Sequence, residues 1–498
     1  MSDVGKKTSR LFESSRLYLW ATVVFSIAIT LAGASQKRVS PVDASMRASM
    51  ARTIVETGKL FPPYYDGEAL LDHPPGYIWS IAASFKVFGV NDFAAQLPGR
   101  LSAFLSLLLT WLIARRIGLG ELAAFFSVLV LGTTRDFILI AMQGGIEPLL
   151  NLWSWLGFYF VLPESGQTRL KTDRKALLRT GLAAACVVLA AFTKGPPAAW
   201  PLLFFLAVLS FYGENLRGRF FHGSVFLIAL AGAALPWIWY IFASGDLWYW
   251  KWYWQDQVLG SALRGRNMQQ GFEPLYFIKV LAKDYWPWLP LLLISIGLQA
   301  KTLFRWALPG AGFLALMFAG GFFAGFSIVK WKFWYYIAPA FPGVAIFIAF
   351  AMEQQAVFTR IAQKLHLEKA VLAISVLWIL AVSIFPINLS SSRLLELQVF
   401  KETLRNSPAT MPVWFVNHPG DHNMYATSGN WYFNRIVRKV TDIASWEKNL
   451  RGPAWIITGL EEFKSCKKDW CLNAAFTQSA GSSTLIYLAA TFSRSSVR

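Results

Sequence analysis

Long apolar stretches constrain this chain more than any other feature of its sequence. Many windows of about 18 to 25 apolar residues recur, and each is long enough to cross a hydrocarbon layer of about 30 Å as a helix. Of the 498 residues, 55% are hydrophobic and only 15% are charged, unlike an ordinary soluble protein. We predict an all-α, multi-spanning membrane protein with about 11 to 13 transmembrane helices. The helices are expected near residues 17–35, 97–114, 119–135, 138–162, 180–196, 198–212, 223–243, 276–299, 306–327, 333–352 and 370–388.

The formal net charge of +19 lies mainly in short loops between these helices. If the N-terminus is inside, the cytoplasmic loops carry basic clusters such as Arg115 with Arg116 and Arg174 with Lys175. This is the positive-inside pattern, in which Lys and Arg fix the orientation of the spans. Most of the excess charge therefore sets topology, and no nucleic-acid partner is expected. Eleven crossings would place the C-terminus outside.

Polar regions interrupt the helices on the predicted outer side. The first loop, residues 36–96, contains two segments with helical spacing, which we expect to lie along the membrane surface. The second region, residues 244–275, is rich in Trp and Tyr, which suits a membrane interface. The tail, residues 389–498, alternates strand-like segments, "MPVWFV", "AWIITG" and "STLIYLAATF", with helix-like segments, "LLELQVFKETLRN" and "LEEFKSC". It predicts a small outer α/β domain after a membrane domain of residues 1–388.

Three cysteines do not make a disulfide scaffold. Cys186 falls in a predicted membrane helix, where it is expected to pack. Cys466 and Cys471 fall in the outer tail, where an oxidising compartment permits a disulfide, and we favour that bridge. Two free thiols or a weak metal pair are the alternatives.

Two acidic elements in the first loop are candidate catalytic groups, because ionisable residues at the mouths of membrane helices are costly. Asp43 follows "RVSP" after the first predicted helix. It is either a catalytic carboxylate or the cap of a helix that starts at Ala44. Asp72 and His73 stand in "LLDHPPGYIW", where the two prolines restrict the backbone and orient both side chains. The alternative is a turn that begins a surface helix, with Asp72 as its cap.

Glu147, in "AMQGGIEPLLNLW", is a third candidate catalytic carboxylate. It is expected inside the fourth span, roughly 13 Å from the outer end at about 1.5 Å per residue. A buried carboxylate there needs a partner. Each basic residue on the same side could alone be an interfacial side chain, but several that converge would make a phosphate site. The basic candidates are Arg47, Arg52, Lys194, Arg264, Arg266, Lys330 and Lys332.

The sequence leaves a metal open and predicts no cofactor with certainty. The tail segment "HPGDH" offers His418, Asp421 and His422 as ligands for a divalent ion. Pro and Gly break any helical spacing in that segment.

Five motifs together resemble the GT-C superfamily of polyprenyl-phosphate-sugar glycosyltransferases. They are "VDASMRASMA", "LLDHPPGYIW", "AAQLPGRL", "FTKGPP" and "FSIVKWKFWYYIAP". The closest resemblance is to bacterial lipid A aminoarabinose transferases and protein O-mannosyltransferases, and it spans about residues 17–345. It implies a GT-C helix bundle, a catalytic Asp43 and donor contacts from the basic residues and Tyr336.

The motifs depart from the family at the donor contacts. The acidic pair of the family reads Asp43-Ala44, and its Arg three residues after that Asp is Met46, with Arg47 next to it. Its Glu-Lys before Pro-Pro becomes Asp72-His73, and its "RLP" arginine is Gln96. The catalytic Asp is retained, whereas the residues at the donor-phosphate contacts differ, so the resemblance does not identify the substrate.

The resemblance implies an inverting glycosyltransferase that moves a sugar from a polyprenyl-phosphate donor to a lipid, glycan or protein acceptor. Such an enzyme would act on the outer face of the cytoplasmic membrane. Lipid A modification is the closest example. The main alternative is a transporter or flippase, but such folds usually show related halves, which this sequence lacks. A non-catalytic relative is a third alternative, against which the retained Asp43 counts.

Overall fold

Two compact units divide the chain in the computed structural model. The first comprises Met1–Gln36, Leu71–Tyr77 and Gln96–Ile387, and the second comprises Lys37–Leu70, Ile78–Ala95 and Asn388–Arg498. The second unit therefore combines most of the first loop with the tail. The structure describes residues 3–31, 42–65, 68–69, 74–163, 169–244, 251, 253–264, 273–304, 311–355, 367–384, 399–404, 406–408, 411–416, 431–433, 437–440, 453–466, 475–480 and 483–488.

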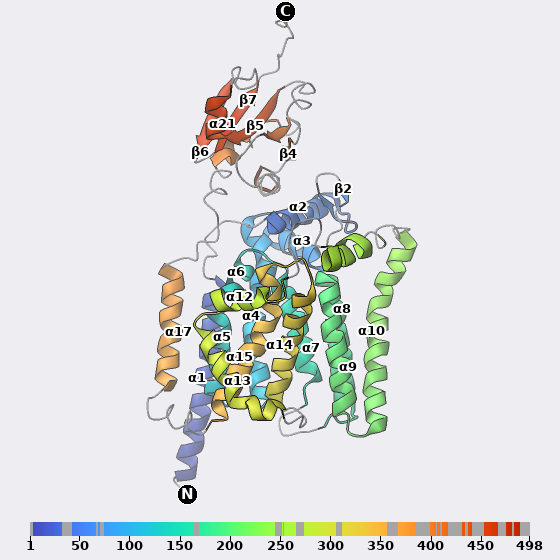
Figure 1. The fold of residues 1–498 in the computed structure, drawn as a ribbon, viewed down its shortest axis with the longest axis vertical. Helices are drawn as coiled ribbons and strands as arrows, with labels where there is room; N and C mark the ends of the chain where they lie inside the picture. The colour runs from blue at the N-terminus through green and yellow to red at the C-terminus, as the bar shows by residue number, and fades with distance from the viewer. Residues whose placement is uncertain are drawn as a thin grey trace, which may run out of the picture. The chain divides into compact units, whose positions relative to one another are not determined.

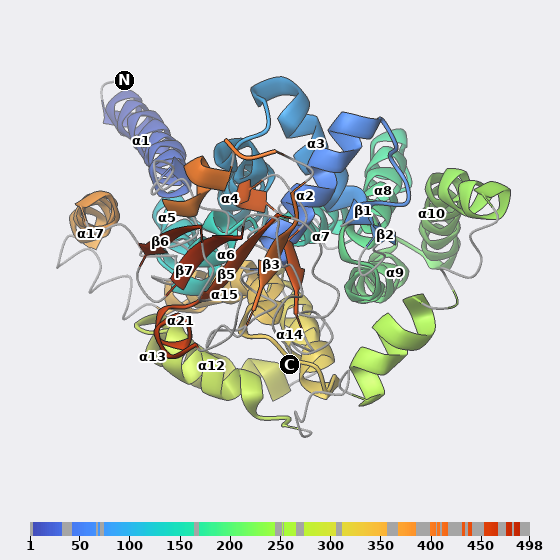
Figure 2. The same cartoon turned by 90° about the horizontal axis from the view of Figure 1, so that it is seen from above.

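The first unit is a bundle of helices (Figures 1 and 2). Its elements are α1 (Asp3–Leu31), α4 (Asp92–Arg116) apart from its first turn, which belongs to the second unit, α5 (Glu121–Gly132), α6 (Arg135–Met142), α7 (Glu147–Val161), α8 (Arg174–Lys194), η1 (Pro196–Ala198), α9 (Ala199–Tyr212), α10 (Leu216–Ser244), η2 (Tyr253–Arg264), α12 (Tyr276–Asp284), α13 (Trp288–Phe304), α14 (Ala311–Ile328), η4 (Trp334–Ala340), α15 (Phe341–Glu353) and α17 (Leu367–Ile384). Helix α8 packs between α7 and α10, and α15 packs against α5, α13 and α14.

Several of these helices can cross a membrane. Among the described residues, four are long and apolar enough, or five if the bent pair α5–α6 forms one span. Shorter apolar helices accompany them, including parts of α1, α9, α13, α14 and α17. The chain is therefore a multi-pass membrane protein, and the count of about 11 to 13 crossings stays a prediction.

Two long predicted helices are broken in the structure. The helix expected over 138–162 divides into α6 and α7, because Gly144 has φ 76°, a left-handed conformation that interrupts the helix. The helix expected over 276–299 divides into α12 and α13. Pro287 lies at that second break and has no N–H to continue the hydrogen bonding.

An aromatic cluster holds the centre of the first unit. The ring of Phe318 on α14 lies 5.0 Å from Trp155, 5.1 Å from Phe158 and 5.0 Å from Phe204, measured between centroids. The Trp155 indole N–H also donates to the Pro339 carbonyl over 2.8 Å. These contacts join α7, α9, α14 and η4, so that η4 is fixed against α7.

The second unit contains helices and two sheets. Its elements are α2 (Val42–Thr57), β1 (Tyr64–Tyr65), β2 (Glu68–Ala69), most of α3 (Gly76–Phe88), β3 (Val413–Phe415), β4 (Val437–Lys439), β5 (Ala454–Gly459), α21 (Leu460–Ser465), β6 (Phe476–Ala480) and β7 (Ser483–Leu488). The tail sheet has the order β4-β3-β5-β7-β6. Strands β4, β3 and β5 are parallel, whereas β7 is antiparallel to both β5 and β6.

One face of the tail sheet carries a small apolar core. Val416, Val440, Ile456 and Ile486 are buried together, and Phe463 and Cys466 pack against them. Strands β3, β5 and β7 lie where strand-like segments were predicted, and α21 lies where a helix was predicted. The mixed sheet agrees with the coarse prediction of an α/β tail. The predicted division of the chain into domains at residue 388 stays a prediction.

The cysteines differ in state. Cys186 is a free, buried thiol. Cys466 is disulfide-bonded, as expected, and its predicted partner Cys471 lies outside the described residues.

Candidate functional site

A buried ion pair joins the ends of two packed helices in the first unit. Lys194 is the last residue of α8, and Glu147 is the first residue of α7. The Lys194 Nζ donates to Glu147 Oε1 over 2.6 Å, and the two side chains are only 8% and 4% exposed. The sequence fixes this end of α8, because Gly195 follows with φ 75° and Pro196 comes next.

This position corrects the prediction for Glu147. It was expected inside a continuous span, but the break at Gly144 makes it the start of a helix. The carboxylate therefore lies at the positive end of the α7 dipole and beside an ammonium group.

Aromatic rings surround the ammonium group of Lys194. Its Nζ lies 4.1 Å from the centroid of the Tyr336 ring, 5.8 Å from that of Tyr335 and 5.9 Å from that of Phe326. Cation–π attraction is strongest where the cation is desolvated, as it is here. The structure thus brings together three predicted site residues, Glu147, Lys194 and Tyr336.

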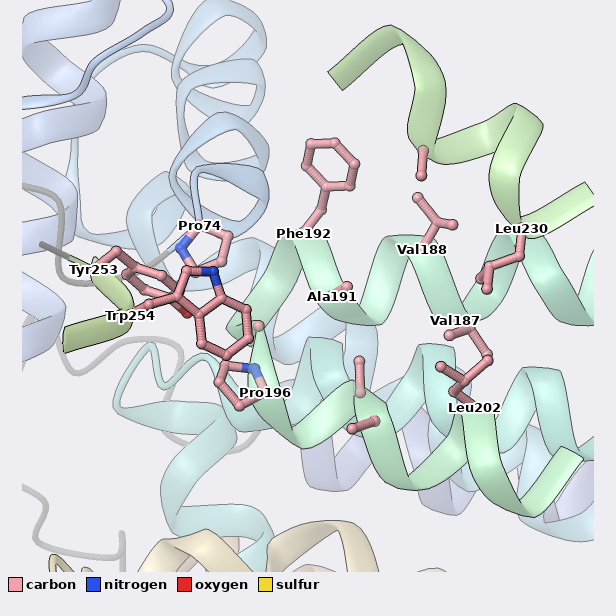
Figure 3. Close-up of a pocket in the computed structure, with 14 residues that line it drawn as sticks. Pro74, Val187, Val188, Ala191, Phe192, Pro196, Leu202, Leu230, Tyr253 and Trp254 are labelled. Atoms are coloured by element: carbon pink, nitrogen blue, oxygen red, sulfur yellow. The ribbon is translucent and has the colours of Figure 1, made fainter. Parts of the chain in front are cut away.

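An apolar cavity of about 380 Å³ begins beside this cluster (Figure 3). Gly195 and Pro196, the residues directly after Lys194, line it. In Figure 3, Tyr253 and Trp254 lie at one end near Pro196, and Leu230 lies toward the other end. The lining is almost wholly apolar, so the cavity suits a hydrocarbon chain. Its other lining residues are Pro74, Val187, Val188, Ala191, Phe192, Ala198, Ala199, Leu202 and Ala234.

The predicted Asp72-His73 element lies outside the part of the chain that the structure describes. Pro74, which follows them, lines the cavity.

Asp43 and Arg47 form a second ion pair, in the second unit. Arg47 Nη2 lies 3.5 Å from Asp43 Oδ2, one helical turn away on α2. The arginine side chain is 6% exposed, whereas that of Asp43 is 44% exposed. Helix α2 begins at Val42, so Asp43 lies inside the first turn and does not cap a helix from Ala44, as the alternative had it. If Asp43 stabilises α2, it does so mainly because its carboxylate interacts favourably with the dipole of that helix.

Lys330 and Lys332 lie on a segment that pairs with η2. The backbone N–H of Lys330 donates to the Ala262 carbonyl over 3.2 Å, and that of Trp331 to the Ser261 carbonyl over 3.2 Å. Lys332 is only 3% exposed. Burial lowers the pKa of Lys332, and the Glu273 carboxylate opposes this to a smaller extent. The side chain of Arg264, and Arg266 altogether, lie outside the described residues, so their predicted convergence with Lys332 is untested.

Two charged groups were missed by sequence reasoning. Asp136 is buried at the start of α6, and Arg135 Nη1 lies 3.2 Å from both Asp136 Oδ1 and Asp284 Oδ1. Asp136 falls between the helices predicted over residues 119–135 and 138–162. The apolar run directly after it, "FILIAM", was the signal for a buried position.

The second missed group, Arg100, bears on the departure noted at Gln96. Arg100 follows Gln96 by one turn of α4, and its Nε and Nη2 donate to Gln96 Oε1 over 3.2 and 2.9 Å. Its Nη1 also donates to the Thr30 carbonyl over 2.9 Å. A buried guanidinium therefore lies one turn beyond the position where the family has its arginine.

Among the residues that the structure describes, no three His, Cys, Asp or Glu side chains gather as metal ligands. The "HPGDH" segment lies outside those residues. The divalent metal therefore stays a prediction.

The chain is similar in sequence to one protein family and to several known proteins. Residues 72–239 match the family described as dolichyl-phosphate-mannose-protein mannosyltransferase. An undecaprenyl phosphate-alpha-4-amino-4-deoxy-L-arabinose arabinosyl transferase of Pseudomonas fluorescens is 28% identical over 318 residues, which is 62% of this chain and 52% of that protein. An uncharacterized protein of Aquifex aeolicus is 26% identical over 62% of this chain and 59% of its own length. The matches thus span little more than half of the curated relatives.

Solved structures match a longer part of this chain than the related sequences do. ArnT from Cupriavidus metallidurans bound to undecaprenyl phosphate matches with a TM-score of 0.71 and 16% identity, over 95% of this chain and 97% of that one. The Archaeoglobus fulgidus oligosaccharyltransferase in its apo form matches with a TM-score of 0.53 and 11% identity, over 90% and 70%. The predicted resemblance to GT-C glycosyltransferases of the aminoarabinose-transferase and O-mannosyltransferase type is therefore confirmed, and this chain has their fold.

Proposed function

We propose that this protein transfers a sugar from a polyprenyl-phosphate donor to an acceptor of the cell envelope. The observation that carries the proposal is the apolar cavity beside the buried Lys194–Glu147 pair. A polyprenyl phosphate joins a long hydrocarbon chain to an anionic head. The cavity suits part of the chain, and the ammonium group of Lys194 suits the phosphate.

The surroundings of Lys194 fit a site that receives and releases a phosphate. Glu147 and the Tyr336 ring hold the cation in a desolvated position before any ligand arrives. An incoming phosphate would share the ammonium group with Glu147. Electrostatic contacts of this kind are strongest where water is excluded. Arg47, His73, Arg264, Arg266, Lys330 and Lys332 are the further candidates for substrate contacts.

The reaction is a displacement at the anomeric carbon. An acceptor hydroxyl forms a bond to that carbon while the bond to the phosphate oxygen breaks, and polyprenyl phosphate leaves. We assign Asp43 the role of the base that takes the hydroxyl proton, with Asp72 as a second candidate. A single displacement inverts the anomeric configuration. The half-exposed carboxylate of Asp43 supports this role, because a base must be accessible to its substrate.

The relatives suggest the donor and the setting. Several are undecaprenyl-phosphate aminoarabinose transferases, so a pentose on undecaprenyl phosphate is the first donor to test. The acceptor would be an envelope lipid such as lipid A, a glycan or a protein. The site would face outward from the cytoplasmic membrane, with the tail on the same side. A transporter or flippase could also use an apolar cavity, but the matched relatives whose names give an activity are transferases, which favours transfer.

The test is a transfer assay with a variant that fills the cavity. Ala191→Phe on α8 would occupy space that the hydrocarbon chain needs, and it should weaken donor binding by about tenfold, or about 1.4 kcal/mol. Leu189→Phe is the matched control, because Leu189 is on the same helix, is exposed and does not line the cavity. Release of polyprenyl phosphate and sugar on the acceptor would be followed by mass spectrometry. Movement of the donor across vesicles without sugar transfer would instead identify a flippase.

A further inference from the structure

Trp431 of the tail is clamped by helices of the first loop. These segments belong to the same compact unit. Trp431 is 6% exposed, and its indole N–H donates to Asp92 Oδ1 over 2.7 Å. Asp92 is the first residue of α4. The hydrogen bond is charge-assisted and therefore stronger than one between neutral groups.

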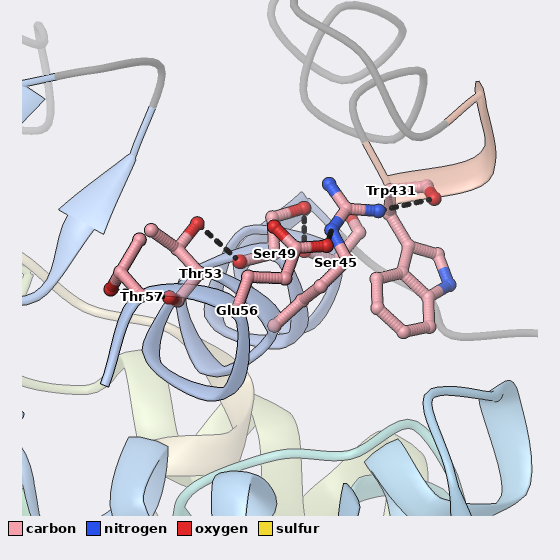
Figure 4. Close-up of polar contacts among 7 residues, drawn as sticks. Ser45, Ser49, Thr53, Glu56, Thr57 and Trp431 are labelled. Atoms are coloured by element: carbon pink, nitrogen blue, oxygen red, sulfur yellow. Dashed lines mark hydrogen bonds and ion pairs between the residues drawn. The ribbon is translucent and has the colours of Figure 1, made fainter. Parts of the chain in front are cut away.

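Two further helices contact the same indole. The ring of Phe85 on α3 stacks on it with centroids 5.7 Å apart and planes 11° from parallel. The Arg52 guanidinium on α2 lies 5.7 Å from the ring centroid, and its Nη1 donates to the Trp431 carbonyl over 3.3 Å (Figure 4). One side chain thus meets α2, α3 and the start of α4.

The residue after Trp431 faces the tail's own structure. Tyr432 is 2% exposed, and Lys401 Nζ lies 6.0 Å from the centroid of its ring. Two residues beyond Lys401, Thr403 donates to Gln478 Oε1 on β6 over 2.7 Å. Neighbouring side chains therefore link the tail sheet on one side to the first-loop helices on the other.

Helix α2 depends on such outside support. Ser49, Thr53 and Thr57 each donate to the carbonyl four residues earlier, over 3.0, 3.1 and 2.7 Å (Figure 4). Side chains that bond back in this way, and β-branched residues generally, are poor helix formers. A helix of 16 residues with this composition is stabilised mainly by packing.

We propose that Trp431 is a positioning residue, which fixes α2 and thereby sets the position of Asp43. This inference rests on the proposed function, in which Asp43 acts on the acceptor. Arg52 and Asp43 lie on the same helix, about 13 Å apart along its axis. A loss of the clamp at Arg52 would let α2 shift or fray, and the carboxylate in its first turn would move with it.

An indole is required because the clamp uses both its ring and its N–H. Phenylalanine would keep the stacking on Phe85 and the face toward Arg52, but it would lose the hydrogen bond to Asp92. Alanine would lose all of these contacts. The clamp therefore predicts a graded series at one position.

The test compares Trp431→Ala and Trp431→Phe with Trp455→Phe in the full-length protein. Trp455 is a buried tail tryptophan whose ring contacts are with Phe476 and Tyr487 of the same sheet. It controls for a loss of indole in the tail. Hydrogen exchange of the peptide over residues 42–57 should accelerate about tenfold or more in Trp431→Ala, less in Trp431→Phe and not in Trp455→Phe.

Kinetics provide the second readout. In Trp431→Ala, kcat should fall by about tenfold or more while KM for the donor stays within about twofold. A merely structural role would lower the amount of active enzyme and would not follow the graded order of exchange in α2. If Trp431→Ala does not fold, Trp431→Phe and Asp92→Ala decide the question in the same two measurements.

The outcomes separate the two proposals. Unchanged exchange of α2 in folded Trp431 variants would overturn the clamp, whatever the activity. Accelerated exchange with normal kcat would show that the clamp exists but does not position the reaction, and it would overturn the inference. Faster exchange in a protein that shows no sugar transfer even as wild type would refute the proposed function and leave the clamp standing.

Discussion

Two carboxylate–cation pairs in this protein have opposite exposure. Glu147 and Lys194 are both buried and 2.6 Å apart, whereas Asp43 is 44% exposed and lies 3.5 Å from a buried Arg47. A buried pair is held by the cost of leaving either charge alone, while a half-exposed carboxylate remains accessible to solvent and substrate. The difference is the reason why we propose Asp43, and not Glu147, as the carboxylate that takes the proton.

The largest effect is expected from breaking the buried pair. Lys194→Met would leave the Glu147 carboxylate buried without its cation, and it should lower the free energy of unfolding by about 3 to 5 kcal/mol. Thermal unfolding of the purified protein in detergent measures this. The double variant Glu147→Gln with Lys194→Met removes both charges and should recover much of the lost stability. A double variant as unstable as the single one would mean that the pair does not account for the loss.

Asp43→Asn should separate activity from stability. Asparagine cannot accept the proton, so transfer should fall by about 10² or more. The loss of charge near the start of α2 should cost at most about 1 kcal/mol of stability. Turnover and melting temperature would be measured on one preparation. Near-normal turnover would remove Asp43 from the mechanism and make Asp72 the next carboxylate to test.

A third cation to compare with Lys194 and Arg47 is Lys332, which is buried but lies outside the candidate membrane spans. If it contacts the donor phosphate, Lys332→Ala should weaken donor binding by about ten- to hundredfold, because a charge-assisted contact contributes about 1.5 to 3 kcal/mol. Equilibrium binding of the donor to folded variant is the measurement. Unchanged affinity would assign Lys332 to packing at the interface.

The pH dependence gives a second check on Lys332. Burial lowers its pKa below the ordinary value of 10.5, so the charged form is lost at a lower pH than for an exposed lysine. Its contribution to phosphate binding should therefore be full below the lowered pKa and should disappear as pH rises through it, before pH reaches 10.5. Lys332→Arg should keep its charge through this range. Identical pH profiles for the two proteins would contradict the assignment.

Long apolar windows predicted most helices of the bundle, because such windows have few alternative structures. It did not predict the breaks at Gly144 and Pro287, since neither residue outweighs the apolar run around it when hydropathy is averaged. The error mattered at Glu147, which the break moves from the interior of a helix to its start. In the tail, β4 and β6 escaped prediction because their sequences are short and polar, and only the neighbouring strands make them part of a sheet.

The sequence identified single residues of the site, but it did not predict which of them lie in contact. "FTKGPP" and "FSIVKWKFWYYIAP" identified Lys194 and Tyr336, yet nothing local to either motif indicates that the ring lies 4.1 Å from the ammonium group. That contact depends on Trp155 and Phe318, which fix η4 against α7. Long-range packing of this kind is not encoded in local patterns.

The contact between Arg52 and Trp431 also constrains how the protein is made. The two residues are 379 positions apart in the chain. During synthesis, α2 emerges long before its clamp, and at about 5 to 20 residues per second it waits on the order of half a minute. Throughout that interval its hydroxyl-rich helix lacks one of its stabilising neighbours. The helix in the first loop therefore reaches its final stability only after the tail has been synthesised and folded.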